Sequence, residues 1–216
     1  MTQITLVRHG QANTHAQDAA SYDRLSELGQ QQAKWLGDHF TLNAERFDHI
    51  ETGTLLRQRQ TAVGMGYPPI AQNAAWDEMD YFALSDAAQK HHNIPAPKDA
   101  SEFARHLPQV LDLWRADDLP GVPETHAEFT GKIQTALTQL QGRYARVLIV
   151  TSGGVIGAAL RYVLGLDTLA TTKIMLQVQN SSVHQLQYVH DQFMLAAFNA
   201  TPHLDHPDRA HARTRI

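Results

Sequence analysis

ITLVRHGQAN, residues 4–13, is the segment from which the rest of the chain is best interpreted. Its apolar start predicts a buried strand over residues 3–8. Arg8, His9 and Gly10 stand where that strand ends, and the carboxyl edge of an open α/β sheet is where such proteins bind ligands. The guanidinium of Arg8 suits a phosphate or a carboxylate, and the imidazole of His9 can act as base, acid, nucleophile or metal ligand. Considered alone, the triplet also fits a strand end with two incidental polar side chains.

The composition is that of an ordinary globular protein and excludes several functions. The 216 residues are 43% hydrophobic and 19% charged, and this length is enough for one large domain. The net charge of −4 argues against nucleic acid or an anionic membrane as a partner, so an anionic substrate requires a local basic pocket. The absence of cysteine excludes disulfides, thiolate catalysis and cysteine-ligated zinc. We find no signal peptide and no apolar run long enough to span a membrane, and expect a cytoplasmic protein.

Apolar periodicity predicts an α/β fold. Strands that alternate with helices indicate a three-layer α/β/α sandwich around a mostly parallel, mixed central sheet. Strands are expected at residues 3–8, 46–51, 147–150, 173–179, 183–189 and 194–198. Helices are expected at residues 26–40, 55–65, 85–93, 101–116, 124–141 and 155–164.

Three segments depart from this alternation. Residues 11–24 are polar and aperiodic and predict a loop. Residues 70–123 predict a small helical subdomain, inserted over the ligand-binding edge of the sheet and so over the active site. The polar residues 202–216 predict a loose tail. We treat residues 1–216 as a single domain, because no change in composition divides the chain.

Two further motifs carry chemistry. TSGG, residues 151–154, follows a continuous apolar strand and precedes a helix, a place where backbone N–H groups and a hydroxyl can bind an anion. A tight turn explains the same glycines. LLRQRQTA, residues 55–62, carries Arg57 and Arg59 on different faces of a helix, so one of them can turn towards the sheet edge. For each arginine, a solvated or salt-bridged role is the simpler interpretation.

Taken in order, the motifs resemble the histidine phosphatase, or phosphoglycerate mutase-like, superfamily. They cover nearly the whole chain, and the ordered set is specific for the family and much less so for the substrate. The matching segments are LVRHGQA 6–12, LSELGQQQA 25–33, LLRQRQTA 55–62, DEMD 77–80, VTSGG 150–154, NSSV 180–183, FN 198–199 and HL 203–204.

The resemblance implies a phosphomonoester hydrolase that works through a phosphohistidine. His9 matches the nucleophile, which divides one difficult displacement into two easier ones. Arg8 and Arg57 match the arginines that clamp the phosphate and stabilise its charge in the transition state. Glu78 stands where the family keeps its general acid and base. Asp77 and Asp80, in the same motif, are the competing carboxylates.

The resemblance also suggests the remaining contacts. Gln11 and Asn13, on the loop after the nucleophile, and Ser152 and Gly153, at the second junction, are candidate phosphate or substrate contacts. The expected substrate is a phosphorylated small molecule or peptide. No metal or other cofactor is expected, because the arginines supply the positive charge. The oligomeric state is left open.

Ser152 stands where the family usually has a second catalytic histidine. A hydroxyl is a neutral donor on a shorter arm, and the loss of one oxyanion donor lowers a rate by about 10²–10³-fold. We therefore expect a slow enzyme. Three histidines are candidates to compensate, although an exposed or structural role is the simpler interpretation of each: His126, His184 and His203.

Gly53 is a second departure, because the family commonly has a serine there. The glycine removes a hydroxyl that would cap the helix or contact phosphate. Thr52 and Thr54 are the candidates to supply that hydroxyl instead.

Two other functions compete with hydrolysis. The presence of Ser152 in place of a histidine favours a catalytically weak or inactive protein that binds a phosphorylated ligand and has a regulatory role. His9, the two arginines and Glu78 favour an enzyme, because a binding module needs neither nucleophile nor acid. A phosphoglycerate mutase-type phosphotransferase is less favoured, because residues 11–24 and 70–123 are short for segments that retain a bisphosphate.

Overall fold

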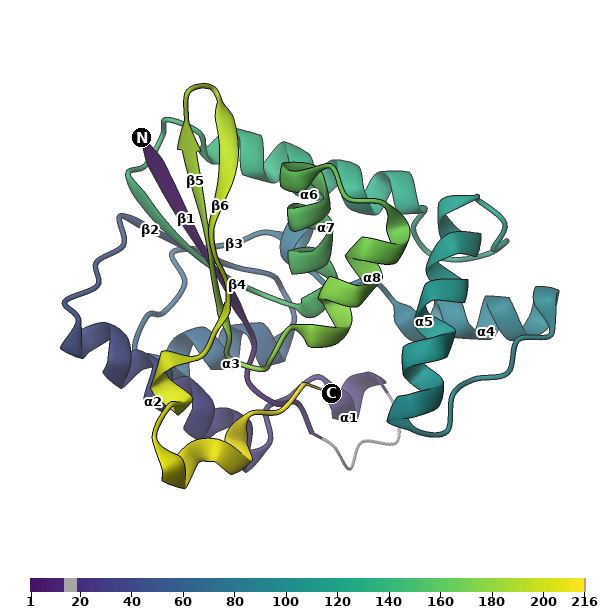
Figure 1. The fold of residues 1–216 in the computed structure, drawn as a ribbon, viewed down its shortest axis with the longest axis horizontal. Coiled ribbons are helices and arrows are strands. Elements are labelled where there is room, and N and C mark those ends of the chain that lie inside the picture. Colours follow the sequence, from purple (N-terminus) through teal and green to yellow (C-terminus); the bar gives the residue numbers. More distant parts are fainter. Residues whose placement is uncertain (14–18, 216) are drawn as a thin grey trace.

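A six-stranded sheet with the order β3-β2-β4-β1-β5-β6 forms the centre of the molecule (Figure 1). The computed structural model describes residues 1–13 and 19–215. Its strands are β1 (Thr2–Arg8), β2 (His49–Thr52), β3 (Ala71–Gln72), β4 (Arg146–Thr151), β5 (Val183–Val189) and β6 (Gln192–Ala200). The four strands from β3 to β1 are parallel, and β5 and β6 are antiparallel to their neighbours. The predicted mostly parallel, mixed sheet is confirmed.

Eight α-helices surround the sheet within the described residues. They are α1 (Ala19–Tyr22), α2 (Glu27–Leu42), α3 (Leu56–Gly64), α4 (Tyr81–His92), α5 (Ala100–Arg115), α6 (His126–Leu140), α7 (Gly153–Leu164) and α8 (Thr168–Gln177). Three short 3-10 helices complete the fold: η1 (Ala74–Trp76), η2 (Pro202–Leu204) and η3 (Pro207–Ala212).

The sheet is buried on both faces, because its side chains alternate between two cores. Ile4 and Leu6 pack with residues of α6 and α7. Val7 packs on the opposite face with residues of α2 and α3. Figure 1 shows α2 and α3 on one side of the sheet and α6 and α7 on the other. The three-layer arrangement therefore follows from the period of two in the central strands.

The register of β1 and β4 brings the two motif-bearing junctions together. Leu6 lies opposite Ile149, and Arg8 lies opposite Thr151. The backbone N–H of His9 donates to the carbonyl of Thr151 at 2.9 Å. Because the strands are parallel, both junctions open at the same edge of the sheet.

Between α3 and β4 the chain forms β3, η1, α4, α5 and α6. The helices α4 and α5 lie together at one side of the molecule (Figure 1). Their buried side chains, including Leu84 and Leu107, belong to the same hydrophobic cluster as Ile4 of β1. The helix α4 begins at Tyr81, earlier than expected, because Asp80 caps it by accepting a hydrogen bond from the N–H of Ala83 at 3.0 Å.

The strand predicted at residues 173–179 is wrong, because most of this segment belongs to α8. Asp167 caps this helix and accepts from the N–H of Ala170 at 2.7 Å. The hydroxyls of Thr171 and Thr172 each donate to the carbonyl four residues earlier. The β-branched residues of this segment are typical of a strand and led to the wrong prediction. Packing against α7 and α5 stabilises the helix instead.

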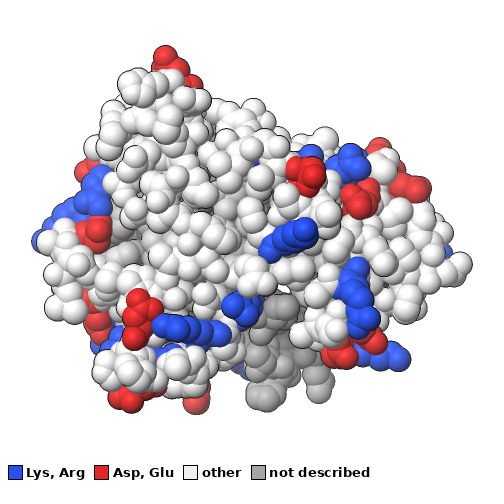
Figure 2. Space-filling model, viewed as in Figure 1, with Lys and Arg blue, Asp and Glu red and all other residues white. Residues whose placement is uncertain are grey.

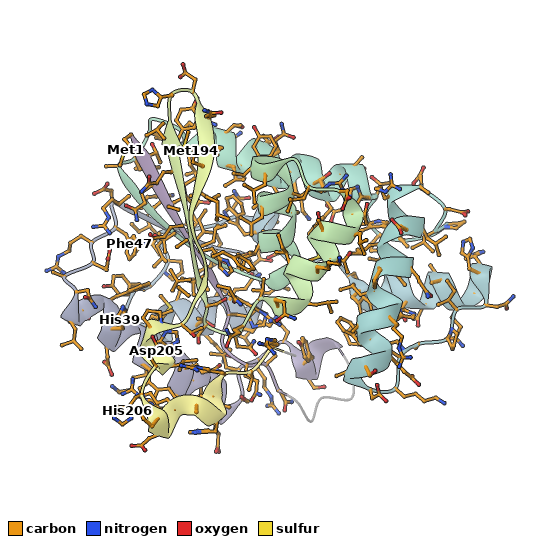
Figure 3. All side chains as sticks on the ribbon, in the orientation of Figure 1. Met1, His39, Phe47, Met194, Asp205 and His206 are labelled. Carbon is orange, nitrogen blue, oxygen red and sulfur yellow. The ribbon has the colours of Figure 1, made fainter. Side chains whose placement is uncertain are left out.

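The predicted loose tail is also wrong for the described residues 202–215. Leu204 and Ala212 are fully buried. The side-chain amide of Gln32 donates to the carbonyl of Ala212 at 2.7 Å and to the hydroxyl of Thr214 at 3.1 Å. Figure 3 shows the start of this segment, at the labelled residues Asp205 and His206, against α2, on which His39 is labelled. The sequence predicted a loose tail because the segment is mostly polar, and the few apolar and backbone contacts that fix it give no signal in the sequence.

No helix within the described part of the chain is both long enough and apolar enough to cross a membrane.

Candidate active site

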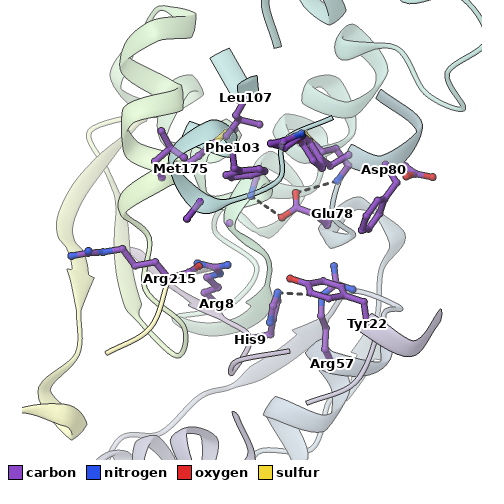
Figure 4. Close-up of a pocket in the computed structure, with 18 of the residues that line it drawn as sticks. Arg8, His9, Tyr22, Arg57, Glu78, Asp80, Phe103, Leu107, Met175 and Arg215 are labelled. Atoms are coloured by element: carbon purple, nitrogen blue, oxygen red, sulfur yellow. Dashed lines mark hydrogen bonds between the residues drawn. The ribbon is translucent and has the colours of Figure 1, made fainter. Parts of the chain in front are cut away.

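A cavity of about 780 Å³ opens at the carboxyl edge of β1 and β4 (Figure 4). It brings together five of the residues singled out in the sequence: Arg8, His9, Arg57, Glu78 and Gly153. On the face seen in Figure 2, Lys and Arg side chains are interspersed with Asp and Glu side chains. The arginines of the cavity thus supply the local positive charge that an acidic chain needs to bind an anion.

His9 is buried at the end of β1 and is held in one tautomer. Its Nδ1 lies 2.7 Å from the carbonyl oxygen of Gly10, which can only accept, so the ring proton belongs on Nδ1. Its Nε2 accepts a hydrogen bond from Nε of Arg57 at 3.2 Å (Figure 4). Burial, and then the charges of Arg57 and Arg8, hold the pKa of His9 well below its usual value. His9 is therefore a neutral imidazole whose Nε2 carries a lone pair.

The backbone of His9 is held by the segment from Asn180 to Ser182. The N–H of Ser181 donates to the carbonyl of His9 at 3.3 Å, and the amide of Asn180 donates to the same oxygen at 3.4 Å. The carbonyl of Ser182 accepts from the N–H of Arg8 at 3.1 Å. These three residues thus fix the backbone at His9 and do not line the cavity.

Arg57 lies in the first turn of α3 and is fixed by residues that the sequence did not single out. Its Nη1 forms an ion pair with Asp23 at 2.9 Å. Asp23 also accepts from the backbone N–H groups of Leu56, at 2.9 Å, and of Arg57, at 3.2 Å. The ring of Tyr22 lies 5.3 Å from the Arg57 guanidinium. Both partners fall in residues 11–24, where the sequence predicted a loop and gave no periodic signal for either side chain.

Arg8 extends from β1 into the cavity beside His9 and is half-buried. Its Nη1 donates to the carbonyl oxygens of Val178 and Arg215. Its Nε is buried and has no hydrogen-bond partner among the described residues. Burial lowers the pKa of Arg8, but an arginine remains a cation at neutral pH. Arg215 was missed because the tail was expected to be loose.

Glu78 reaches the cavity from the loop between η1 and α4. Its Oε2 accepts from the N–H of Gly154 at 3.0 Å, in the first turn of α7. Its Oε1 accepts from the N–H of Met79 at 3.1 Å. A Cβ atom at position 154 would lie 2.1 Å from Oε1 of Glu78, so only glycine admits the carboxylate here.

The competing carboxylates have structural roles. Asp77 accepts from the N–H of Thr54 at 2.5 Å and from its hydroxyl at 2.6 Å. Asp80 caps α4 and lines the cavity. Glu78 is the carboxylate of this motif that lies opposite His9 and the arginines (Figure 4).

Ser152 is adjacent to the cavity but does not line it. Its side chain is fully buried, and its hydroxyl accepts from the amide of Gln58 at 2.8 Å. The same amide donates to the carbonyl of Trp76 at 2.9 Å. A Cβ atom on Gly53 would lie 2.0 Å from Oε1 of Gln58 and 2.4 Å from the Asp77 carboxylate. Positions 53 and 152, where the resemblance led us to expect a serine and a histidine, are therefore linked through Gln58.

None of the three histidines considered as substitutes lines the cavity. His184 contacts the hydroxyl of Ser182 at 3.0 Å, and His203 contacts that of Ser181 at 2.8 Å. Burial lowers the pKa of each to about 3. Nε2 of His126 lies 3.0 Å from the guanidinium of an arginine on α7, and mainly burial lowers its pKa to about 4. All three are structural.

Gln11 and Asn13 are likewise absent from the cavity wall. Oε1 of Gln11 accepts from the hydroxyl of Ser26, the cap of α2, at 2.8 Å. The amide of Asn13 donates to the carbonyl of Ser21 at 2.9 Å. Within the described residues, no group of three or more His, Asp and Glu side chains has the arrangement of a metal site.

Residues 4–201 match the histidine phosphatase superfamily (branch 1), and the chain therefore belongs to this family. The match confirms the predicted family and the prediction of an enzyme of the phosphatase class. Comparison with curated proteins gives no match.

Solved structures share the fold at low sequence identity. The chain is similar to a phosphoserine phosphatase from Entamoeba histolytica, with a TM-score of 0.68 and 20% identity over 94% of this chain and 100% of that one. It is similar to a phosphoglycerate mutase from Bacillus anthracis, with a TM-score of 0.70 and 21% identity over 94% of each chain. A mycobacterial glucosyl-3-phosphoglycerate phosphatase in complex with inorganic phosphate gives a TM-score of 0.67 and 20% identity, over 95% of this chain and 100% of that one. The α/β fold is thereby confirmed.

Proposed function

We propose that this protein is a phosphomonoester hydrolase that works through a phosphohistidine on His9. The observation that carries the proposal is the neutral Nε2 of His9, held against Arg57 and beside Arg8 at the edge of the cavity. The unpartnered Nε of Arg8 supports it, because a buried cationic donor without an acceptor suits an anionic ligand.

In the first step, the lone pair on Nε2 of His9 attacks phosphorus. The bond from phosphorus to the ester oxygen breaks, and Glu78 gives its proton to the departing oxygen. Arg8 and Arg57 balance the charge on the non-bridging oxygens.

In the second step, Glu78 accepts a proton from water as the water oxygen attacks the phosphohistidine. The phosphorus–nitrogen bond breaks, its electron pair returns to Nε2, and orthophosphate leaves. Nδ1 of His9 keeps its proton throughout, because the Gly10 carbonyl accepts from it. These steps require no metal, since the two guanidinium groups carry the positive charge.

A regulatory module that binds phosphate with little turnover is the second candidate. The hydroxyl of Ser152, engaged by Gln58 and turned away from the cavity, favours it. A regulatory module needs neither a nucleophile such as His9 nor an acid such as Glu78, so we rank this candidate below the hydrolase.

The test is orthophosphate release from an aryl phosphate by the natural protein and by His9→Ala. We expect release only from the natural protein, together with an acid-labile phosphohistidine. His91→Ala, on the exposed end of α4, is the matched control and is expected to behave as the natural protein. Equal rates for the natural protein and His9→Ala refute the catalytic proposal. Phosphate binding without release would support the regulatory module.

A further inference from the structure

The lining of the cavity changes from charged to apolar side chains beyond Glu78. Figure 4 shows Phe103, Leu107 and Met175 grouped past Glu78, on the side away from His9. The apolar and aromatic side chains that line the cavity come mainly from the start of α4, from α5 and from α8. They include Met79, Tyr81, Phe82, Phe103, Leu107 and Met175.

The polar atom of this wall is already engaged. The hydroxyl of Tyr81 lies 2.8 Å from Nδ1 of His106, and burial raises the pKa of Tyr81 to about 12. The ring of Tyr81 packs edge-on against Phe103 at 5.1 Å. Tyr81 thus offers the cavity an uncharged ring supported by a second ring.

The charges on this side of the cavity do not favour a second anion. Asp80 and Asp99 line the cavity, and their carboxylates are fixed as caps of α4 and α5. Among the described residues that line the cavity, Lys98 is the one lysine, and it is exposed. Arg215 also lines the cavity, but its side chain extends away from Arg8 and from Glu78 (Figure 4).

We propose that the leaving group of the substrate is an uncharged, apolar alcohol, alkyl or aryl, which packs against Phe103, Leu107 and Met175. This inference rests on the proposed function, because Glu78 protonates the departing oxygen and so directs the body of the alcohol past itself to the apolar wall. A leaving group with a carboxylate, such as phosphoserine or 3-phosphoglycerate, meets Asp80 and Asp99 instead and is a poor substrate.

Straight-chain alkyl phosphates from ethyl to octyl test this proposal, because their alcohols differ in length and hardly in leaving-group chemistry. We expect kcat/KM, measured by orthophosphate release, to rise about two- to fourfold for each added CH₂ until the wall is covered. A flat series overturns the inference, as does turnover of phosphoserine or 3-phosphoglycerate that equals turnover of hexyl phosphate.

Binding separates this inference from the proposed function. Alkylphosphonates cannot be hydrolysed. Calorimetric titration with phosphonates of the same chain lengths therefore measures binding to the apolar wall even if the protein has no phosphatase activity. We expect the Kd to fall along the series, and 3-phosphonopropionate to bind more weakly than propylphosphonate. Binding that is insensitive to chain length overturns the inference. Absence of phosphohistidine and orthophosphate, with length-dependent binding, instead refutes the hydrolase and leaves the wall established.

Phe103→Ala locates the effect. We expect this variant to lose most of the dependence on chain length in both series, and Phe103→Leu to recover part of it. Phe198→Ala, on β6 and outside the cavity, is the matched control and is expected to keep the full dependence. Equal slopes for Phe103→Ala and Phe198→Ala overturn the assignment of the wall.

Discussion

Replacing Ser152 by histidine tests how the second junction limits the reaction. The hydroxyl of Ser152 accepts from Gln58 at 2.8 Å in a fully buried site, so an imidazole must enter space that Gln58 occupies. Overpacking a close-packed interior costs about 1–3 kcal/mol, and a lost buried hydrogen bond costs about 0.5–1.5 kcal/mol. We expect Ser152→His alone to lose about 2–4 kcal/mol of unfolding free energy and to gain little activity.

The double variant Gln58→Ala/Ser152→His provides the room that the single variant lacks. We expect its unfolding free energy to exceed the additive value by about 1–3 kcal/mol. With an imidazole donor beside the phosphate, formation of phosphohistidine accelerates by up to about 10²-fold.

The assay is a double-mutant cycle on four proteins: the natural one, the two single variants and the double variant. Denaturant unfolding gives the free energies, and single-turnover phosphohistidine formation gives the rates. Gln58→Ala alone controls for its lost hydrogen bond to the Trp76 carbonyl. The reasoning is refuted if the free energies are additive, or if Ser152→His alone reaches the rate of the double variant.

Three further predictions follow from single contacts. Asp23→Asn removes the ion pair with Arg57. We expect it to raise KM about tenfold or more and to lower the free energy of unfolding by about 1–3 kcal/mol; unchanged steady-state kinetics would contradict a positioning role for Asp23. Thr214→Val removes the hydroxyl that donates to Asn180 at 2.8 Å and should lower the unfolding free energy by about 1–2 kcal/mol, whereas a tail that contributes nothing leaves Tm unchanged. Burial holds the pKa of His184 at about 3 in the folded protein, against about 6.5 when unfolded, so the unfolded state binds its proton first and stability is lost as pH falls from about 6.5 to about 3. We expect His184→Gln to reduce this loss of unfolding free energy at low pH by a few kcal/mol, as measured by denaturant unfolding at a series of pH values. An unchanged dependence of stability on pH would contradict the burial of a neutral His184.

The sequence determined the elements whose signal is local. The apolar run before Arg8 specifies β1, because a strand buried on both faces needs continuous apolar residues. Ser26 caps α2 as expected, accepting from the N–H of Gly29 at 3.0 Å. Arg8 and His9 were singled out because their motif stands at the end of a buried strand, whereas Arg57 and Glu78 were singled out through the resemblance to the histidine phosphatase superfamily.

Tertiary structure decided everything that depends on a partner distant in the chain. The segment 173–179 has β-branched residues that suit either conformation, and only its packing against α7 and α5 selects α8. Asp23 and Arg215 join the site through contacts with Arg57 and Arg8, 34 and 207 residues away. Gln58 turns Ser152 from the cavity although the two are 94 residues apart. Local patterns report conformation and burial, whereas the direction of a polar side chain depends on the acceptors and donors that folding brings beside it.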